Sequence, residues 1–206
     1  MSIRGLYVIT DPELIPAHRL LNDVVEVIAG GARIVQYRNK TADYPTRLQQ
    51  AREIRQICRD RNVTFIVNDD AELTVELDAD GIHIGEQDLA LPNARRVVGP
   101  TRLIGVSCYN DLNRARRSWE RGADYVAFGS FYPSATKPKA RRASLALLRR
   151  ARQELPIPII AIGGITLENG ASLLKAGADA LAVIHAVFGA ADRRIAAEQL
   201  AKLFYQ

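Results

Sequence analysis

The chain has 206 residues, of which 48% are hydrophobic and 25% charged, and its formal net charge at pH 7 is +5. This composition is typical of a globular protein, and no apolar run approaches the roughly 18 residues that cross a membrane. We therefore expect a cytoplasmic protein with no membrane contact, and two reduced, structural cysteines, Cys58 and Cys108. The arginines are scattered along predicted helices without interleaved aromatic residues, which argues against nucleic-acid binding.

Short apolar segments alternate with helical patterns along the whole chain. The predicted strands are 5–10, 33–38, 64–68, 80–85, 103–107, 124–129, 158–162 and 178–185. The predicted helices are 18–29, 44–61, 71–77, 91–98, 110–121, 143–154, 167–176 and a last one that ends near 204. Glycine followed by alanine recurs where a helix closes and a strand opens, at Gly31, Gly122 and Gly177. This strict alternation without a linker predicts a single (β/α)₈ TIM barrel over residues 1–206.

Two neighbouring strands near the end of the chain lead into loops of small residues. The strand at 158–162 is apolar throughout and stops at Gly163 and Gly164, and the next strand runs into a short turn at 185–188. In (β/α)₈ barrels the loops after strands seven and eight, together with a short extra helix, hold a phosphate group. The sequence therefore predicts a phosphate site made largely of backbone at these loops.

Charged residues follow several of the other strands, at the end where this fold carries its active site. Arg38, Lys40 and Lys137 are cations, and Asp69 and Asp88 are carboxylates that end neighbouring strands. Mg²⁺ in proteins takes one or two carboxylates and bridges phosphate oxygens of the substrate. The pattern thus predicts a Mg²⁺-bound diphosphate beside a second phosphorylated ligand, and transfer of an organic group with loss of pyrophosphate. No covalent nucleophile is required, because stabilisation of the leaving group would supply most of the rate.

The motifs at the strand ends, taken together and in order, resemble those of the thiamine-phosphate synthase family. They are Tyr-Val-Ile-Thr-Asp at 7–11, Gln-Tyr-Arg-Asn-Lys at 36–40, Asn-Asp at 68–69, Asp-Gly-Ile-His-Ile-Gly at 80–85 with Asp88, Gly-Val-Ser at 105–107, Thr-Lys at 136–137 and Ala-Ile-Gly-Gly-Ile at 161–165. The resemblance implies that hydroxymethylpyrimidine diphosphate is ionised and that a thiazole phosphate, or its carboxylated precursor, captures the pyrimidine cation. The products would be thiamine phosphate and pyrophosphate, so the expected partners are small-molecule substrates.

The resemblance also implies roles for individual residues. The pyrimidine diphosphate would be held by Gln36, Arg38, Lys40, Asn68, Ser107 and the backbone of Tyr37 and Asn39. Mg²⁺ would be bound by Asp69 and Asp88, and the catalytic residues would be Lys137 at the departing pyrophosphate, Ser107 and Arg38. The thiazole phosphate would be held by Ser134, Ala135, Thr136, Gly164 and the backbone of Ile184 and His185. His185 departs from the family, which has serine there, and its role is left open.

Several alternatives stay open at this point. A thiazole tautomerase of the same superfamily would need neither Mg²⁺ nor the pyrimidine-diphosphate residues, and a non-catalytic thiamine-precursor binding protein would not turn over. His83 is interpreted as a hydrogen-bonded barrel histidine in preference to a catalytic base. Asp11 either orients Arg38 or caps a turn, and Asp70 either assists the metal or caps a helix. The long connection 130–142 is interpreted as a lid, and the preferred thiazole form and a homo-oligomeric state are left undecided.

Overall fold

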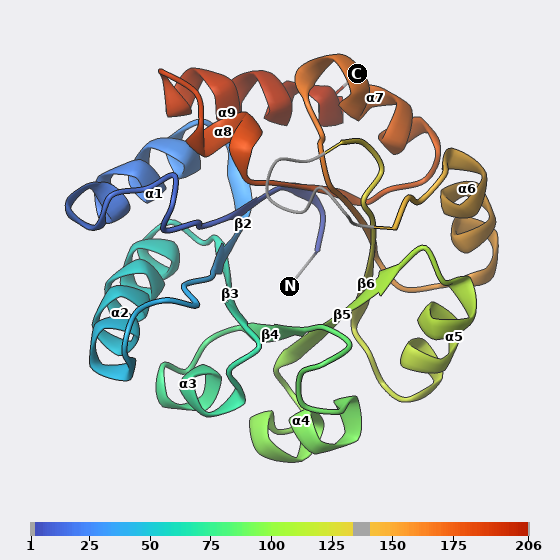
Figure 1. Ribbon diagram of the computed structural model, residues 1–206, viewed down its shortest axis with the longest axis horizontal. Helices are drawn as coiled ribbons and strands as arrows, with labels where there is room; N and C mark the ends of the chain where they lie inside the picture. Colours follow the sequence, from blue (N-terminus) through green and yellow to red (C-terminus); the bar gives the residue numbers. More distant parts are fainter. Residues whose placement is uncertain (1–2, 134–140, 206) are drawn as a thin grey trace.

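Eight parallel strands form a closed barrel in which each strand pairs with its neighbours in chain order and β8 pairs with β1 (Figure 1). The computed structural model describes residues 3–133 and 141–205. The strands are β1 Gly5–Ile9, β2 Ala32–Tyr37, β3 Thr64–Asn68, β4 Gly81–Ile84, β5 Leu103–Tyr109, β6 Tyr125–Phe128, β7 Ile159–Ile162 and β8 Ala180–Val183. The predicted (β/α)₈ barrel is therefore confirmed.

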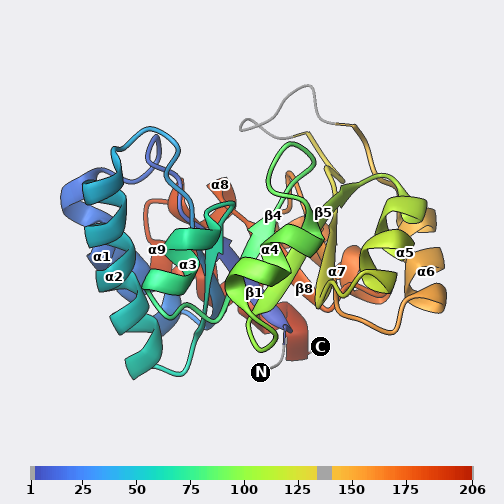
Figure 2. The ribbon, with the colours of Figure 1, turned by 90° about the horizontal axis from the view of Figure 1, so that it is seen from below.

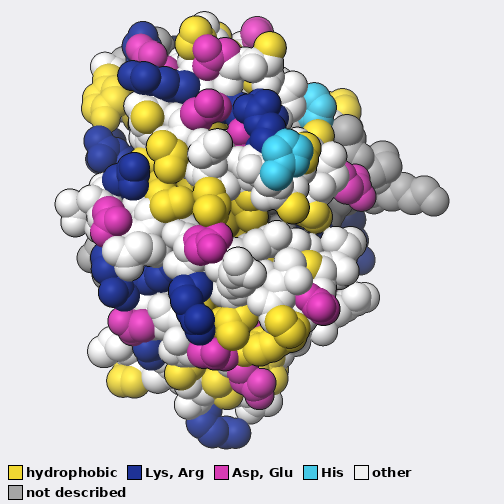
Figure 3. Space-filling view, turned by 90° about the vertical axis from the view of Figure 1, so that its left-hand side faces the viewer, with side chains coloured by type: hydrophobic (Ala, Val, Ile, Leu, Met, Phe, Trp, Pro, Cys, Tyr) yellow, Lys and Arg dark blue, Asp and Glu magenta, His cyan; other side chains and the backbone are white. Residues whose placement is uncertain are grey.

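The helices form a ring outside the barrel (Figure 1). They are η1 Ala17–Arg19, α1 Leu20–Ala29, α2 Tyr44–Asp60, α3 Ala71–Glu76, α4 Leu91–Val98, α5 Leu112–Glu120, α6 Leu145–Glu154, α7 Leu167–Lys175, α8 His185–Phe188, α9 Arg193–Lys202 and η2 Leu203–Tyr205. Among the described residues, none of these helices is long and apolar enough to cross a membrane. On the face that Figure 3 shows, basic and acidic side chains are interspersed with apolar ones rather than gathered by sign.

Most element boundaries lie within two residues of those predicted, and two differences have a clear physical reason. The predicted helix 18–29 begins as a 3₁₀ turn, because Pro16 precedes it in an extended conformation and only the residues from Leu20 onward are α-helical. β5 runs past Ser107 to Tyr109, and its pairing with β6 shifts register between these two residues. Ser107 pairs with Ala127 and Tyr109 with Phe128, so Cys108 has no partner on β6 and β5 has one extra residue over this stretch.

Alternation along the strands sorts the apolar residues into two cores. One core lies between barrel and helices and includes Leu6, Val8 and Val35. The other lies inside the barrel and includes Tyr7, Ile34 and Ile66. Because side chains two apart on a strand share a face, the polar residues that continue these inward rows also point into the barrel.

The carboxyl ends of the strands share one end of the barrel, and the loops that follow them surround its mouth. Figure 2 shows α8 and the loop after β4 at this end, while both chain termini lie at the opposite end. In (β/α)₈ barrels the active site is built from these loops. The candidate site therefore lies on the face that is remote from both termini.

A glycine on β5 makes room for an aromatic ring inside the barrel. Gly105 pairs with Tyr125 on β6, and a Cβ added at Gly105 would lie 2.0 Å from Cζ of the Tyr125 ring. Tyr125 is fully buried, so the ring has no free space into which it can move. Gly105 is therefore required by the crossing of Tyr125 through the barrel interior.

We predict that Gly105→Ala lowers the free energy of unfolding by about 1–3 kcal/mol, because the added methyl group overpacks the interior against Tyr125. Denaturant titration checks this. The matched background is Tyr125→Leu, which removes the clashing ring atoms; there Gly105→Ala should cost at least about 1 kcal/mol less. Equal costs in both backgrounds would show that the Tyr125 ring is not the obstacle.

Candidate functional site

The Asp69 carboxylate, at the tip of β3, interacts with an ammonium group and with a side-chain amide N–H. Asp69 follows Asn68, the last residue of β3, and its backbone adopts a left-handed φ of 55°, which aspartate tolerates better than most residues. Its Oδ2 lies 2.5 Å from Nζ of Lys40 and accepts a hydrogen bond of 2.8 Å from the Asn68 amide. The structure thus brings together three of the predicted site residues, from the loops after β2 and β3.

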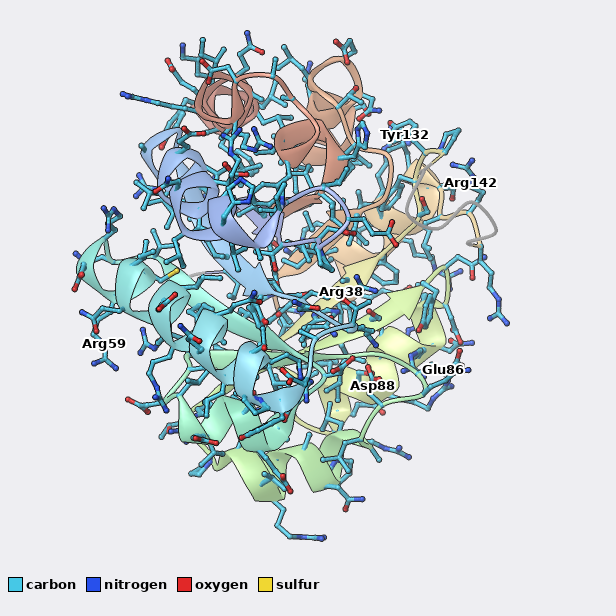
Figure 4. All side chains as sticks on the ribbon, turned by 60° about the vertical axis from the view of Figure 1, so that its left-hand side comes forward. Arg38, Arg59, Glu86, Asp88, Tyr132 and Arg142 are labelled. Atoms are coloured by element: carbon cyan, nitrogen blue, oxygen red, sulfur yellow. The ribbon has the colours of Figure 1, made fainter. Side chains whose placement is uncertain are left out.

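The second predicted metal ligand lies in the loop after β4, and this loop is held by local hydrogen bonds. Oδ2 of Asp88 accepts from the Gly85 N–H at 2.6 Å. The Glu86 N–H donates to the Tyr109 hydroxyl at 3.3 Å, which joins this loop to the end of β5. Figure 4 shows Asp88 and Glu86 on this loop. One carboxylate oxygen of Asp88 is therefore held by the backbone of its own loop. This loop follows β4, the neighbour of the strand that ends at Asp69.

The loop after β2 is anchored to β1 by a residue that sequence reasoning did not single out. Thr10 is buried, and its Oγ1 accepts from the Arg38 N–H at 2.8 Å and donates to the Arg38 carbonyl at 3.2 Å. The Tyr37 side chain lies in the core between barrel and helices, and its hydroxyl donates to Gln50 of α2. Only its backbone is left for the contact that the sequence predicted. The Asn39 side chain accepts from the Thr41 and Ala42 N–H groups and shapes the loop.

Inside the barrel, beneath the mouth, five polar side chains from five strands form one hydrogen-bonded row. Gln36 Nε2 donates to the Tyr7 hydroxyl at 2.6 Å, which lies 3.2 Å from the Tyr125 hydroxyl. Nδ1 of His83 lies 3.3 Å from the Tyr125 hydroxyl, and its Nε2 lies 2.9 Å from Oγ of Ser107. His83 is thus the hydrogen-bonded barrel histidine that the sequence favoured. The row joins the predicted site residues Gln36 and Ser107.

Burial keeps both tyrosines of this row in the neutral form. Tyr7 and Tyr125 are buried, and loss of hydration raises the pKa of each hydroxyl above its ordinary value. Both hydroxyls therefore keep their protons at neutral pH and are available as donors.

Ser107 is held through its backbone as well as its side chain, because Nε of Arg114 donates to its carbonyl at 2.8 Å.

The glycine pair after β7 accommodates the loop after β6 at close range. Gly163 and Gly164 have φ values of +102° and +64°, in the region that glycine adopts without strain. A Cβ at Gly163 would lie 2.2 Å from Oγ of Ser130, and one at Gly164 2.2 Å from the Pro133 carbonyl oxygen. The sequence predicted close approach of a ligand here; the structure shows that the chain's own backbone already requires these glycines.

The remaining predicted residues fall into two groups. Ile184 precedes the short helix α8 and His185 opens it, exposed, so the extra helix expected after β8 is present. Ser134, Ala135, Thr136 and Lys137 lie outside the described residues, as does the middle of the predicted lid. Figure 4 shows Tyr132 and Arg142 on the two arms of this connection.

Two carboxylates for which the sequence left alternatives open make capping hydrogen bonds. Oδ1 of Asp11 accepts from the Glu13 N–H at 2.9 Å, so Asp11 caps a turn. Oδ1 of Asp70 accepts from the Leu73 N–H at 2.9 Å as the N-cap of α3. Oδ2 of Asp70 also pairs with Arg47 at 3.2 Å. Both residues thus have the capping role that was one of the two alternatives for each.

The fold and this mouth define a (β/α)₈-barrel protein with its polar and charged site at the strand tips. The family model described as thiamine monophosphate synthase matches residues 6–187. Thiamine-phosphate synthase of Thiobacillus denitrificans is 49% identical over 200 residues, which are 97% of this chain and 94% of that protein. Thiamine-phosphate synthase of Nitrosococcus oceani is 48% identical over 196 residues, 95% of this chain and 90% of that protein.

A solved structure of thiamine phosphate pyrophosphorylase from Pyrococcus furiosus superposes with a TM-score of 0.90 at 37% identity, covering 98% of this chain and 95% of that one. The chain belongs to the thiamine monophosphate synthase family. The family that the strand-end motifs indicated is thereby confirmed.

We predict that Thr10→Val loosens the loop that carries Arg38, because the shape is kept while the Arg38 N–H loses its acceptor. Amide hydrogen exchange at Arg38 should accelerate by roughly 5- to 150-fold, which corresponds to about 1–3 kcal/mol for an unsatisfied buried donor. Thr101→Val, at an exposed position before β5, is the control and should leave this amide unchanged. Unaltered exchange at Arg38 in Thr10→Val would contradict the anchoring role.

Proposed function

We propose that this chain is a Mg²⁺-dependent thiamine-phosphate synthase. It would transfer the hydroxymethylpyrimidine group from its diphosphate to thiazole phosphate, or to the carboxylated thiazole phosphate, and release pyrophosphate. The observation that carries the proposal is the grouping of Lys40, Asn68 and Asp69 at the tips of β2 and β3, with Asp88 in the loop after the neighbouring strand β4. A tautomerase or a binding protein without turnover would not need this combination of cations and carboxylates.

The donor chemistry of the mouth fits Mg²⁺. Asp69 and Asp88 each use Oδ2 in a bond within the protein, and the described residues supply no hydrogen-bond partner for either Oδ1. Within residues 3–133 and 141–205 no group of three or more His, Cys, Asp or Glu side chains could hold a metal by itself. An ion here would therefore take at most two carboxylates and complete its shell with water and phosphate oxygens, as Mg²⁺ prefers. When bound, Mg²⁺ would neutralise the charge of the diphosphate.

The protein's own cations would then orient and stabilise the leaving group. The Lys40 ammonium is half exposed while paired with Asp69, so it remains accessible to a phosphate. Arg38 is fixed through its backbone, and its guanidinium offers several N–H donors that suit phosphate oxygens. As the bond between pyrimidine carbon and diphosphate oxygen breaks, negative charge would gather on the departing pyrophosphate, and these two cations would stabilise it.

The acceptor substrate would bind across the mouth, at β7 and β8. There the proposal uses the Gly164 backbone and the backbone of Ile184 and His185, with residues 134–137 completing the cradle. The thiazole nitrogen would supply the electron pair for the new carbon–nitrogen bond, so no side chain needs to form a covalent intermediate. His185 is exposed at the start of α8 and could offer its imidazole to a phosphate where the family has a serine hydroxyl.

The direct test incubates the protein with the pyrimidine diphosphate and thiazole phosphate, with and without Mg²⁺, and detects product by mass spectrometry. Thiamine phosphate and pyrophosphate should form in equal amounts and only with Mg²⁺. Absence of thiamine phosphate under all conditions would overturn the proposed function.

We predict that Asp69→Asn lowers turnover by roughly a hundredfold or more, because it removes one charged ligand of the metal at constant shape. Asparagine is chosen because it also tolerates the left-handed backbone at this position. Asp60→Asn, exposed at the end of α2, is the matched control and should keep full activity. Wild-type turnover by Asp69→Asn at limiting Mg²⁺ would remove Asp69 from the metal site.

A further inference from the structure

The two peptide groups that flank Gly164, after β7, are both held by hydrogen bonds to their carbonyls. The Gly163 carbonyl accepts from the Tyr132 N–H at 3.0 Å, and the Gly164 carbonyl accepts from Nδ2 of Asn169 at 3.0 Å. Tyr132 lies in the loop after β6, and Asn169 is the third residue of α7. Glycine has more backbone freedom than any other residue, so without these bonds Gly164 could rotate at little cost. Two residues that have no assigned role therefore set the conformation of Gly164.

Peptide planarity turns a held carbonyl into a directed N–H. In a trans peptide the carbonyl and the N–H of the following residue point to opposite sides. Since the Gly163 carbonyl bonds the loop after β6, the Gly164 N–H points away from that loop. β7 lies between β6 and β8, so this direction leads toward the β8 side, where Ile184 and His185 are. Among the described residues, none accepts a hydrogen bond from the Gly164 N–H.

The Asn169 amide fits its two backbone partners in one orientation only. Its Oδ1 accepts from the Thr166 N–H at 2.9 Å, while its Nδ2 donates to the Gly164 carbonyl. The polarity of both partners is fixed, so a side chain with two acceptor oxygens cannot make both bonds. Aspartate has the shape of asparagine and would keep the bond to Thr166, but its second oxygen would face the Gly164 carbonyl. Asn169→Asp therefore releases Gly164 while it keeps the bond at the start of α7.

The Tyr132 backbone is held in turn by two hydroxyl groups. Oγ of Ser172 donates its only proton to the Asn169 carbonyl at 2.7 Å, so the Tyr132 hydroxyl must donate to Ser172, at 3.0 Å. Oγ of Ser130 donates to the Tyr132 carbonyl at 2.6 Å. These bonds join Tyr132 to α7 and to its own loop, and they keep its N–H on the Gly163 carbonyl.

We propose that Asn169 and Tyr132 are positioning residues that keep the Gly164 N–H directed at the phosphate group of the acceptor substrate. They act through the backbone of Gly164 and do not contact the reacting atoms. An N–H that is already held in its binding orientation loses less freedom when the phosphate arrives. The inference rests on the proposed function, because it uses the Gly164 backbone as part of the acceptor-phosphate site. It adds the two residues that prevent this peptide from turning over.

The kinetic test compares the two substrates of the proposed reaction. In Asn169→Asp, KM for thiazole phosphate should rise by roughly tenfold or more, because a hydrogen bond to a charged group is lost. KM for the pyrimidine diphosphate should stay at the wild-type value, which a general loss of stability would not allow. Asn169→Ala adds no charge and should show the same selective rise, which separates loss of the hydrogen bond from repulsion of the phosphate. Tyr132→Phe should raise KM for thiazole phosphate by roughly threefold, because one neutral hydrogen bond is lost.

The matched control is Asn93→Asp, which places the same charge at an exposed third residue of another helix, α4. Both KM values should stay at the wild-type level in this variant. An unchanged KM for thiazole phosphate in Asn169→Asp and Asn169→Ala, or an equal rise of KM for both substrates, would overturn the proposal. If the Asn169 variants do not fold, as judged by circular dichroism, the same comparison is made with Tyr132→Phe.

The direction of the N–H is tested by ¹H–¹⁵N NMR of the Gly164 amide. On saturation with thiazole phosphate, the Gly164 proton should shift downfield in the wild type and in Asn93→Asp, because it then donates to a charged oxygen. In Asn169→Asp, also saturated with thiazole phosphate, this shift should be much smaller. A Gly164 amide that does not respond in the saturated wild type would overturn the proposal.

Failure of the proposed function and failure of this inference give different results. A wild type that binds thiazole phosphate and shifts the Gly164 amide, but forms no thiamine phosphate, would overturn the proposed function and support the inference. A wild type that forms thiamine phosphate without a response of the Gly164 amide would overturn the inference alone. A wild type that does not bind thiazole phosphate would overturn both.

Discussion

The constraint on which this structure depends is the two-residue period of strands closed into a small barrel. Because every strand contributes alternate residues to a common interior, Gln36, His83 and Ser107 meet there although they are far apart in sequence. The interior can hold this polar row because Gly105 leaves space for Tyr125. The same alternation directs Asn68 inward at the tip of β3, next to the carboxylate that follows it.

The mouth itself is shaped by short, local bonds rather than by packing. Thr10 holds the backbone of Arg38, the Gly85 N–H holds Asp88, and Arg114 holds the carbonyl of Ser107. Such bonds fix the Asp88 carboxylate and the backbone that carries Arg38 and Ser107. Polar groups that are held in place beforehand lower the cost of stabilising charge in a transition state. The ion pair of Lys40 with Asp69 is partly exposed and screened by water, so it contributes little to the stability of the fold. Its two charges remain accessible to a ligand.

The barrel could be predicted from the sequence, because each strand is a separate apolar run and glycine followed by alanine marks several of the helix ends. The proximity of Lys40, Asn68 and Asp69 could also be predicted, because residues at the tips of adjacent strands must lie close together. The sequence did not reveal that Tyr7 and Tyr125 share a hydrogen bond, since they are 118 residues apart and each alone resembles a core aromatic. Thr10 was similarly missed: its position at a strand end was visible, whereas its two bonds to Arg38 depend on how β1 pairs with β2. The hydrogen-bonded row could have been found by marking, along every strand, the alternate residues that point into the barrel.

The central claim is that the carboxylates after β3 and β4 bind a divalent ion together with a diphosphate. Calorimetric titration of pyrophosphate into the protein, at increasing fixed concentrations of Mg²⁺, tests it most directly. The account predicts tight binding only when Mg²⁺ is present, and loss of that dependence in Asp88→Asn. Equal affinity for pyrophosphate with and without Mg²⁺ in the wild type would contradict it.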